Sequence, residues 1–324
     1  MDNTAKKDSN KDFGASGFCI AVFLFILFFC SAKLFGLKFI VGAIISWVTG
    51  AVIWFLKILF QPASDEEGVD KPFPWLLFLM FPLFIPLSLP SWLIPFILIV
   101  VYFLAVVAFG GHGNHIFNPV IVAVVFMLSG YSYLAVTGAT RPFPAGVNGY
   151  TVYTAGVPPT ADIRDVFASV PAEMALQISM NGSLPNIPGS CFSGYILFAS
   201  FLYALIFRRR LVWWFMAVGS VCTFAWIFPK NPDFAIPPIN VLLLGIMPSL
   251  LLCAVSDFNT IPETHSRQVI NAILFGAFTV FIALRSNEIL APCFGFLLTQ
   301  IVSPLIEDIL CPQSKISIQT EETE

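Results

Sequence analysis

The chain has 324 residues, of which 57% are hydrophobic, 15% are aromatic and only 11% are charged. Soluble domains have about 25% charged residues, so this composition excludes a water-soluble globule and predicts an all-helical integral membrane protein. The net charge of −3 is too small to indicate a nucleic-acid partner. The seven cysteines show no CxxC spacing, so we expect no disulfide framework and no iron–sulfur or zinc site.

Residues 1–16 form a polar tail, and the long apolar run after them predicts a membrane anchor rather than a cleaved signal peptide. A helix needs roughly 20 apolar residues to cross the hydrocarbon core. The third predicted span is short and contains Pro82 and Pro86, and the last is interrupted by Pro292 and Pro304. Ten segments qualify as spans: 17–36, 39–60, 73–89, 91–109, 118–136, 191–207, 211–229, 239–256, 267–284 and 289–310.

Basic residues predict the orientation, because cytoplasmic segments carry an excess of lysine and arginine. With ten spans both termini lie on one side, and placing them in the cytoplasm puts ten of the 16 basic residues there. The triplet Arg208–Arg210 is the strongest single indication of this orientation. We interpret it as a helix-end anchor, with Trp213 and Trp214 at the interface. The expected parts are a cytoplasmic tail (1–16), a five-span half (17–136), an extracytoplasmic loop (137–190), a second five-span half (191–310) and a cytoplasmic tail (311–324).

Five spans in each half would make the second half inverted relative to the first, a common design in ion- and substrate-handling membrane proteins. "GGHGNHIFNPV" before the fifth span has a faint counterpart in "RSNEILAPCFG" before the tenth. Loop 137–190 contains two predicted amphipathic helices, with Thr160 as an N-cap, Pro171 between them and Asn181-Gly182 at the end. We expect these helices to lie on the membrane surface or against a partner.

The segment "GGHGNHIFNP" joins the fourth and fifth spans. Gly110, Gly111 and Gly113 permit positive φ angles and close backbone approach, and Asn118-Pro119 is typical of a helix start. The segment is either a tight turn or a cavity wall, because exposed amides at a helix N-terminus suit an anion or a polar ring edge. His112 and His115 in this segment could suggest a metal site. We expect none, because the chain has only three histidines and no cysteine or carboxylate neighbours His112 and His115 in the sequence.

Two further polar segments interrupt the apolar pattern. "SDFNTIPETHSR", residues 256–267, is dense in hydrogen-bonding groups and by itself is typical of a solvated loop. "LAVTGATRPFP", residues 134–144, is either the turn that ends a helix or a place where a hydroxyl carries a group. No nucleophile elbow, phosphate-binding loop or pair of intramembrane carboxylates is present, so we expect no catalytic residue in this chain.

Together these segments resemble the D subunit of the Rnf electron-transport complex and its relative, the B subunit of the sodium-pumping NADH:quinone reductase. "GGHGNHIFNP" resembles that family's GGxGxNxFNPA, and "SDFNTIPETHSR" resembles its TDPxTxPxT through Asp257, Thr260, Pro262 and Thr264. "NIPGS" resembles the stretch before the sixth span, and "FGFLLTQIVSPLIED" resembles the last span. The likeness covers residues from about 35 to 312.

The resemblance implies an FMN joined through its phosphate to a threonine on the outer face. "LAVTGAT" matches the attachment motif, which makes Thr140 the attachment residue, with Thr137, Gly138 and Ala139 around it. A rival alignment with "YTAGVPPT" would put Val157 at that position, and the chain would then have lost its covalent flavin. A second, non-covalent flavin (riboflavin) is a further expectation at the "GGHGNHIFNP" segment.

The expected function is that of a flavin-carrying membrane subunit in a ferredoxin/NAD Rnf-type complex that translocates ions. It implies other subunits, a flavin transferase and membrane lipid as partners, and the cytoplasmic membrane of a bacterium as the location. Three alternatives remain open. They are the B subunit of a quinone reductase, a channel or solute transporter without a redox group, and a structural subunit that has lost its flavin.

Overall fold

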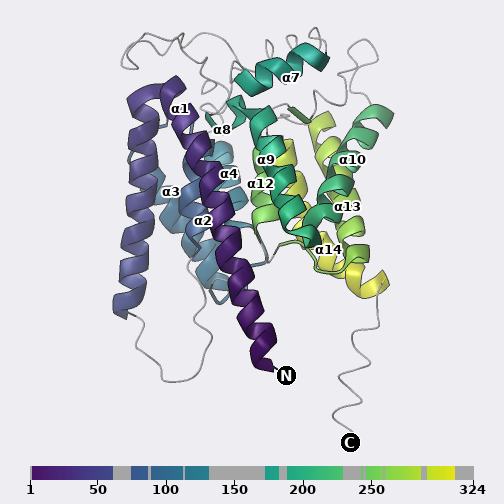
Figure 1. Cartoon of the computed structure of the whole chain (residues 1–324), viewed down its shortest axis with the longest axis horizontal. Coiled ribbons are helices and arrows are strands. Elements are labelled where there is room, and N and C mark those ends of the chain that lie inside the picture. Colours follow the sequence, from purple (N-terminus) through teal and green to yellow (C-terminus); the bar gives the residue numbers. More distant parts are fainter. Residues whose placement is uncertain are drawn as a thin grey trace, which may run out of the picture.

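The computed structural model describes residues 2–60, 74–86, 89–111, 114–130, 172–181, 188–228, 242–243, 246–257, 260–285 and 290–310. Every regular element in these ranges is a helix, which confirms the predicted all-helical class for this part of the chain. The helices stand side by side as a bundle, and the start of α1 and the end of α14 lie at the same end (Figure 1). We call this the lower end.

The first element, α1, covers Asp2–Phe60 and is a helical hairpin rather than one rod. It bends at Gly36, where φ is 67° and ψ is −153°, a conformation open to glycine but costly for other residues. The bend lies at the upper end of the bundle, and the two arms match the predicted spans 17–36 and 39–60 (Figure 1).

The next helices are short and irregular. α2 covers Trp75–Met80 and tightens into the 3₁₀ turn η1, Phe81–Phe84, where Pro82 lacks the amide that an α-helix would use. α3, Leu93–Val101, continues through the π-helical turn η2, Tyr102–Val106, and the 3₁₀ turn η3, Val107–Phe109. α4 begins at Pro119 and is described to Gly130.

The second half of the chain contains the longer helices. α7, Ala172–Asn181, matches the second predicted amphipathic helix, whereas the first lies outside the described residues. The remaining elements are α8 (Pro188–Cys191), α9 (Ser193–Ile206), η4 (Arg208–Arg210), α10 (Leu211–Ile227), α12 (Met247–Ser256), α13 (His265–Arg285) and α14 (Ala291–Leu310). α14 continues through Pro304, so the interruption predicted there is absent from the helix.

Two described stretches are long and apolar enough to cross a membrane by length and composition alone, Cys19–Leu59 and His265–Leu284. The other apolar helices have 10 to 17 residues. Each of the ten predicted spans overlaps a described helix, but the number of membrane crossings stays a prediction, as does the division into two inverted halves.

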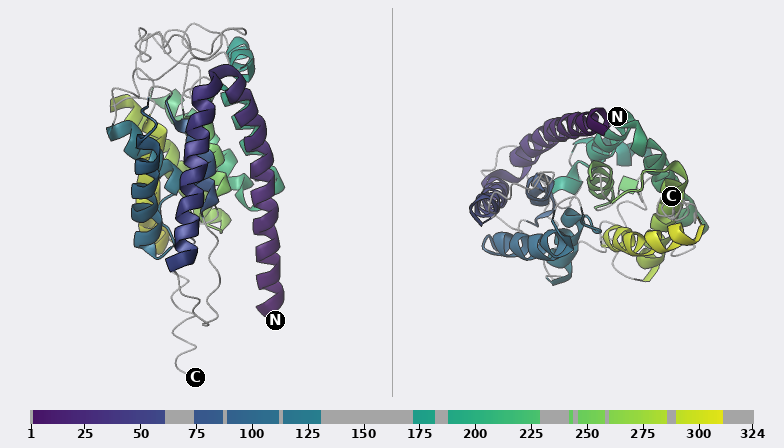
Figure 2. Two further views of the ribbon diagram at one scale, coloured as in Figure 1. Left: turned by 90° about the vertical axis from the view of Figure 1, so that its left-hand side faces the viewer. Right: turned by 90° about the horizontal axis from the view of Figure 1, so that it is seen from below.

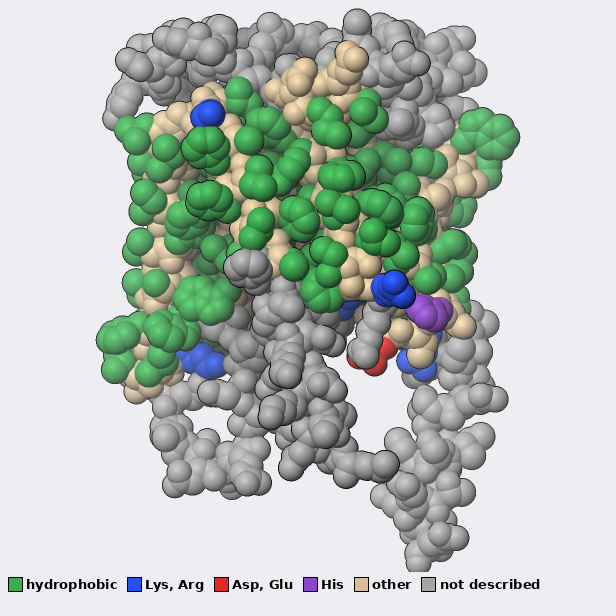
Figure 3. Space-filling view, viewed as in Figure 1, with side chains coloured by type: hydrophobic (Ala, Val, Ile, Leu, Met, Phe, Trp, Pro, Cys, Tyr) green, Lys and Arg blue, Asp and Glu red, His purple; other side chains and the backbone are tan. Residues whose placement is uncertain are grey.

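The outer surface is apolar, as expected for helices in contact with lipid. Large hydrophobic side chains cover the visible face, and its charged side chains lie near the ends of the bundle (Figure 3). Phe25 is 74% exposed and Trp226 is 76% exposed, and soluble monomers rarely expose apolar surface this extensive. Seen from below, the α1 hairpin borders one side of the molecule, while α14 lies at another side, next to α4 (Figure 2).

Candidate functional site

A tight glycine turn precedes α4. Gly110 and Gly111 have φ angles of 87° and 96°, which L side chains rarely adopt. Their amides donate to the carbonyl oxygens of Val107 and Val106, at 3.0 and 2.9 Å. These bonds close the end of the preceding helix. The two glycines therefore adopt the positive φ angles that the sequence was expected to permit.

Asn118 connects three segments of the chain and is fully buried. Its side-chain oxygen accepts hydrogen bonds from the amides of Val120 and Ile121, at 3.0 and 3.3 Å, and so caps α4. Its side-chain amide donates to the carbonyl oxygen of Cys253 in α12 at 3.2 Å. Its backbone amide donates to Oε1 of Gln300 in α14 at 3.4 Å. The start of α4 is therefore tied to α12 and α14.

A buried contact between a histidine and a carboxylate joins the same loop to the end of α12. Nε2 of His115 lies 3.3 and 3.2 Å from the two carboxylate oxygens of Asp257. The two residues are 142 positions apart in the chain, and both are buried. Asp257 follows the last residue of α12 in an extended conformation, with φ −90° and ψ 116°. This extended conformation ends the helix and directs the Asp257 side chain toward His115.

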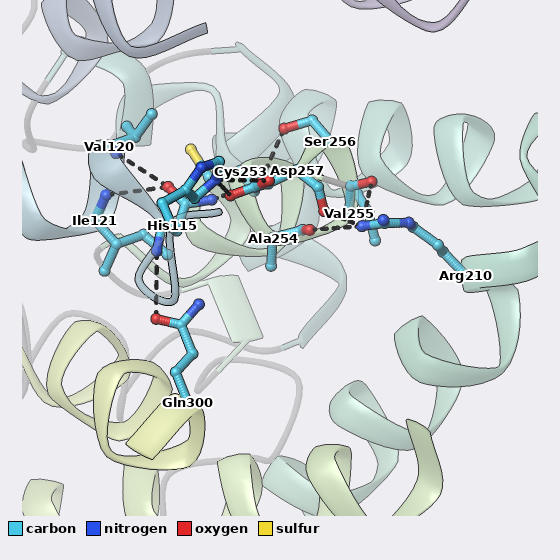
Figure 4. A network of polar contacts seen from close by, with 11 residues as sticks. His115, Val120, Ile121, Arg210, Cys253, Ala254, Val255, Ser256, Asp257 and Gln300 are labelled. Carbon is cyan, nitrogen blue, oxygen red and sulfur yellow. Dashed lines mark hydrogen bonds and ion pairs between the residues drawn. The ribbon is translucent and has the colours of Figure 1, made fainter. Parts of the chain in front are cut away.

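Arg210 lies in η4, the connection between α9 and α10, and contacts the end of α12 on the side away from His115 (Figure 4). Its Nη1 donates to the carbonyl oxygens of Ala254 and Val255, both at 3.3 Å, and to that of Asp257. Burial lowers the pKa of the Arg210 guanidinium, and the Asp257 carboxylate opposes this shift. A cation suits this place because the last carbonyls of a helix carry partial negative charge.

Two buried polar groups beside this network have no partner among the described residues. They are the hydroxyl of Thr260, three residues after Asp257, and the amide nitrogen of Gln300, whose oxygen is bound to Asn118. Buried polar groups are normally satisfied. These two are therefore the atoms of this region best suited to bind a polar group from outside the chain.

The structure brings the two loops that the sequence singled out into contact. Gly110, Gly111 and Asn118 belong to the first loop, and Asp257 and Thr260 belong to the second. His115 of the first loop contacts the Asp257 carboxylate of the second. Asn118 of the first loop donates to the carbonyl oxygen of Cys253, near the end of α12. Thr264 does not share this buried position: it is exposed at the start of α13, where its carbonyl oxygen accepts from the amide of Gln268 at 3.0 Å.

Several of the predicted site residues lie outside the described residues. This holds for the attachment motif, for the rival position and for one glycine of the first loop: Thr137, Gly138, Ala139, Thr140, Val157 and Gly113.

Sequence reasoning missed His115, Arg210 and Gln300 as parts of the site. The sequence shows no carboxylate near His115, but the fold brings Asp257 to it. The interpretation of the arginine triplet as a plain helix-end anchor was wrong for Arg210, which is 6% exposed, and Trp213 and Trp214 are buried as well. Gln300 could have been found from the sequence, because a glutamine inside an apolar span needs a polar partner. In the part of the chain that the structure describes, no group of three or more potential metal ligands occurs.

The fold and this site define a helical protein of membrane type in which two polar loops meet inside the bundle. A family model described as the NQR2, RnfD, RnfE family matches residues 7–315, and the chain therefore belongs to that family. It is also similar to the D subunit of the proton-translocating ferredoxin:NAD(+) oxidoreductase complex of Clostridium ljungdahlii. The two are 24% identical over 281 residues, which cover 83% of this chain and 82% of the relative.

Proposed function

We propose that this protein is the flavin-carrying membrane subunit of an ion-translocating electron-transport complex of the Rnf type. Family membership across residues 7–315 supports a subunit of an Rnf- or Nqr-type complex, and the similarity to the clostridial protein favours the Rnf type. The observation that carries the proposal is the buried network that joins the two motif loops through Asn118, His115 and Asp257.

The first expected cofactor is FMN, attached by a phosphoester to Thr140. A phosphoester needs a free hydroxyl, and the small residues Gly138 and Ala139 leave room for a transferase. The predicted span five starts near Asn118, and the 22 residues from there to Thr140 would rise about 33 Å if they were helical throughout, which is about one hydrocarbon thickness. The hydroxyl would then reach the outer boundary, where Arg141 could offset the phosphate charge.

The test of covalent attachment is Thr140→Val. The protein, made together with its own transferase, should show flavin fluorescence in the denatured gel band, and Thr140→Val should remove it while leaving insertion intact. Thr137→Val is the matched control and should keep the fluorescence. Fluorescence that persists in Thr140→Val, or is absent from the wild type, would leave "TGAT" as a turn only and would favour the alignment that places Val157 at this position.

The second expected cofactor is a non-covalent flavin at the two loops. The residues fit such a group: Thr260 and Gln300 offer buried polar atoms with no partner among the described residues, and no atom lies within 4 Å of a β-carbon built on Gly111. Thr260 and Gln300 would bind polar atoms of the ring, and the turn at Gly111 and the start of α4 at Asn118 would form part of the wall. When bound, a flavin supplies one- and two-electron chemistry.

The test of this second site is Gly111→Val. Because the φ angle of Gly111 is 96°, a β-branched residue strains the turn, and we expect loss of electron transfer and of acid-extractable flavin from an assembled protein. Gly130→Val, at a glycine with open space around it, is the matched control. Normal turnover and normal flavin content in Gly111→Val would reduce the loop to a simple turn.

The proposed setting is the cytoplasmic membrane of a bacterium, with both termini in the cytoplasm and loop 137–190 outside. The partners would be the other subunits of the complex, the flavin transferase and lipid. Because the family description also includes NQR2, a B subunit of a sodium-pumping quinone reductase is the second candidate. Purified complex that reduces quinone from NADH, and not NAD from ferredoxin, would favour that alternative.

A further inference from the structure

Arg210 differs from its neighbour Arg208 in the arginine triplet. Arg208 is exposed, as expected of a basic residue at a membrane surface. Arg210 is buried and donates to three backbone carbonyl oxygens at the end of α12, those of Ala254, Val255 and Asp257. A buried arginine is costly unless it is paired and hydrogen-bonded, so this side chain has a specific task in the fold.

The three carbonyls form a place for a cation. They belong to the C-terminal turn of a helix, where no further turn supplies amide donors and where the helix dipole is negative. The carboxylate of Asp257 adds a full negative charge nearby. Arg210 fills this place with a positive charge that the chain itself supplies.

The same contact determines the direction of Asp257. Asp257 leaves α12 in an extended conformation, and the bond from Arg210 holds its carbonyl oxygen on one side. Its carboxylate meets His115 on the other side, at 3.2 and 3.3 Å. Figure 4 shows Arg210 and His115 approaching the end of α12 from different directions.

We propose that Arg210 is a positioning residue: its guanidinium occupies the carbonyl cluster at the end of α12 and thereby holds Asp257 and the following loop against His115. This inference rests on the proposed function, because the loop it positions is the one that carries Thr260 of the second flavin site. Arg210 acts through Asp257 and does not itself need to touch a cofactor.

The test is chemical rescue in the assembled complex. Arg210→Ala leaves a guanidinium-sized space lined by three carbonyls, and misplacement of a site by about 1 Å can cost roughly 100-fold in rate. We therefore expect a loss of turnover of about that size. Guanidinium ion at millimolar concentration should restore part of it, whereas the same concentration of sodium chloride should not. Arg208→Ala is the matched control and should behave as the wild type does.

A second measurement separates this inference from the proposed function. Hydrogen–deuterium exchange of the segment 254–264 should rise in Arg210→Ala and fall again when guanidinium is added, whether or not the chain carries a flavin. Exchange that responds while turnover does not would overturn the positioning role. Exchange that does not respond at all would overturn the carbonyl site itself. A wild type without bound flavin, but with the exchange response in Arg210→Ala, would count against the proposed function alone.

Discussion

At the scale of single residues, Asn118 links three helices of this molecule. Its carboxamide oxygen caps α4 and its amide reaches α12, while its backbone meets α14. The residue is fully buried, so a polar group that loses its partner here cannot form a replacement hydrogen bond with water. The start of α4, the end of α12 and the middle of α14 therefore depend on one residue.

We expect Asn118→Ala to lower the free energy of unfolding by about 2–3 kcal/mol, of which about 1–2 come from the lost cap and about 1 from the lost bond to Cys253. Asn118→Ser separates the two, because serine keeps a cap acceptor but is too short to reach Cys253. Thermal unfolding of the detergent-solubilised protein measures the loss of stability in each of the two variants. Equal losses in the two variants would contradict a role of Asn118 as a cap.

At the scale of elements, α13 packs closely on both α10 and α14. Asn271 of α13 accepts a hydrogen bond from the indole of Trp213 at 2.8 Å and donates to the hydroxyl of Ser303 at 3.0 Å, so it links all three helices. Small residues allow this closeness, as is usual between membrane helices. At Gly276, a β-carbon would lie 2.8 Å from the backbone carbonyl carbon of Ser220.

We expect Gly276→Ala to destabilise the protein by about 1–3 kcal/mol, because the two helices must move apart to admit one methyl group. Gly219→Ala, in α10, is the control: no atom lies within 4 Å of its β-carbon, and alanine is the better helix former. The two variants should therefore differ in thermal midpoint by several degrees. A midpoint for Gly276→Ala equal to that of Gly219→Ala would show that the contact between α10 and α13 is loose.

At the scale of the whole molecule, the apolar surface and the common end for α1 and α14 fit a protein that enters and leaves the membrane on one side (Figure 1). α9 and α10 meet at η4, which includes Arg210 and lies beside the end of α12. The cluster of basic residues at η4 and the site network therefore belong to the same region of the bundle.

Reporter fusions test this orientation. Alkaline phosphatase fused after Pro144 should be active, and the same enzyme fused after Phe60 should be inactive, because the enzyme needs the oxidising outer compartment. Green fluorescent protein fused to the C-terminus should fluoresce. The opposite pattern would place loop 137–190 in the cytoplasm, out of reach of an extracytoplasmic transferase, and would remove the basis for a flavin on Thr140.

The sequence by itself determined the features that arise within a few residues of one another. Apolar runs predicted the helices, and the bend of α1 separates two predicted spans at Gly36. The glycines of the first loop permitted positive φ angles, which Gly110 and Gly111 adopt, and Asn118-Pro119 predicted the start of α4. Hydropathy, capping and backbone sterics act locally, so a linear chain displays them directly.

Only the tertiary structure decided which of these local features meet. His115 contacts Asp257, which lies 142 positions later in the chain. Arg210 is buried, whereas Arg208, two positions earlier, is exposed. Residue type predicts neither fact, because a charge at a helix end is equally compatible with solvent and with a buried partner. The choice depends on which helix ends pack side by side, and the free energy that decides this comes from contacts between segments far apart in the chain.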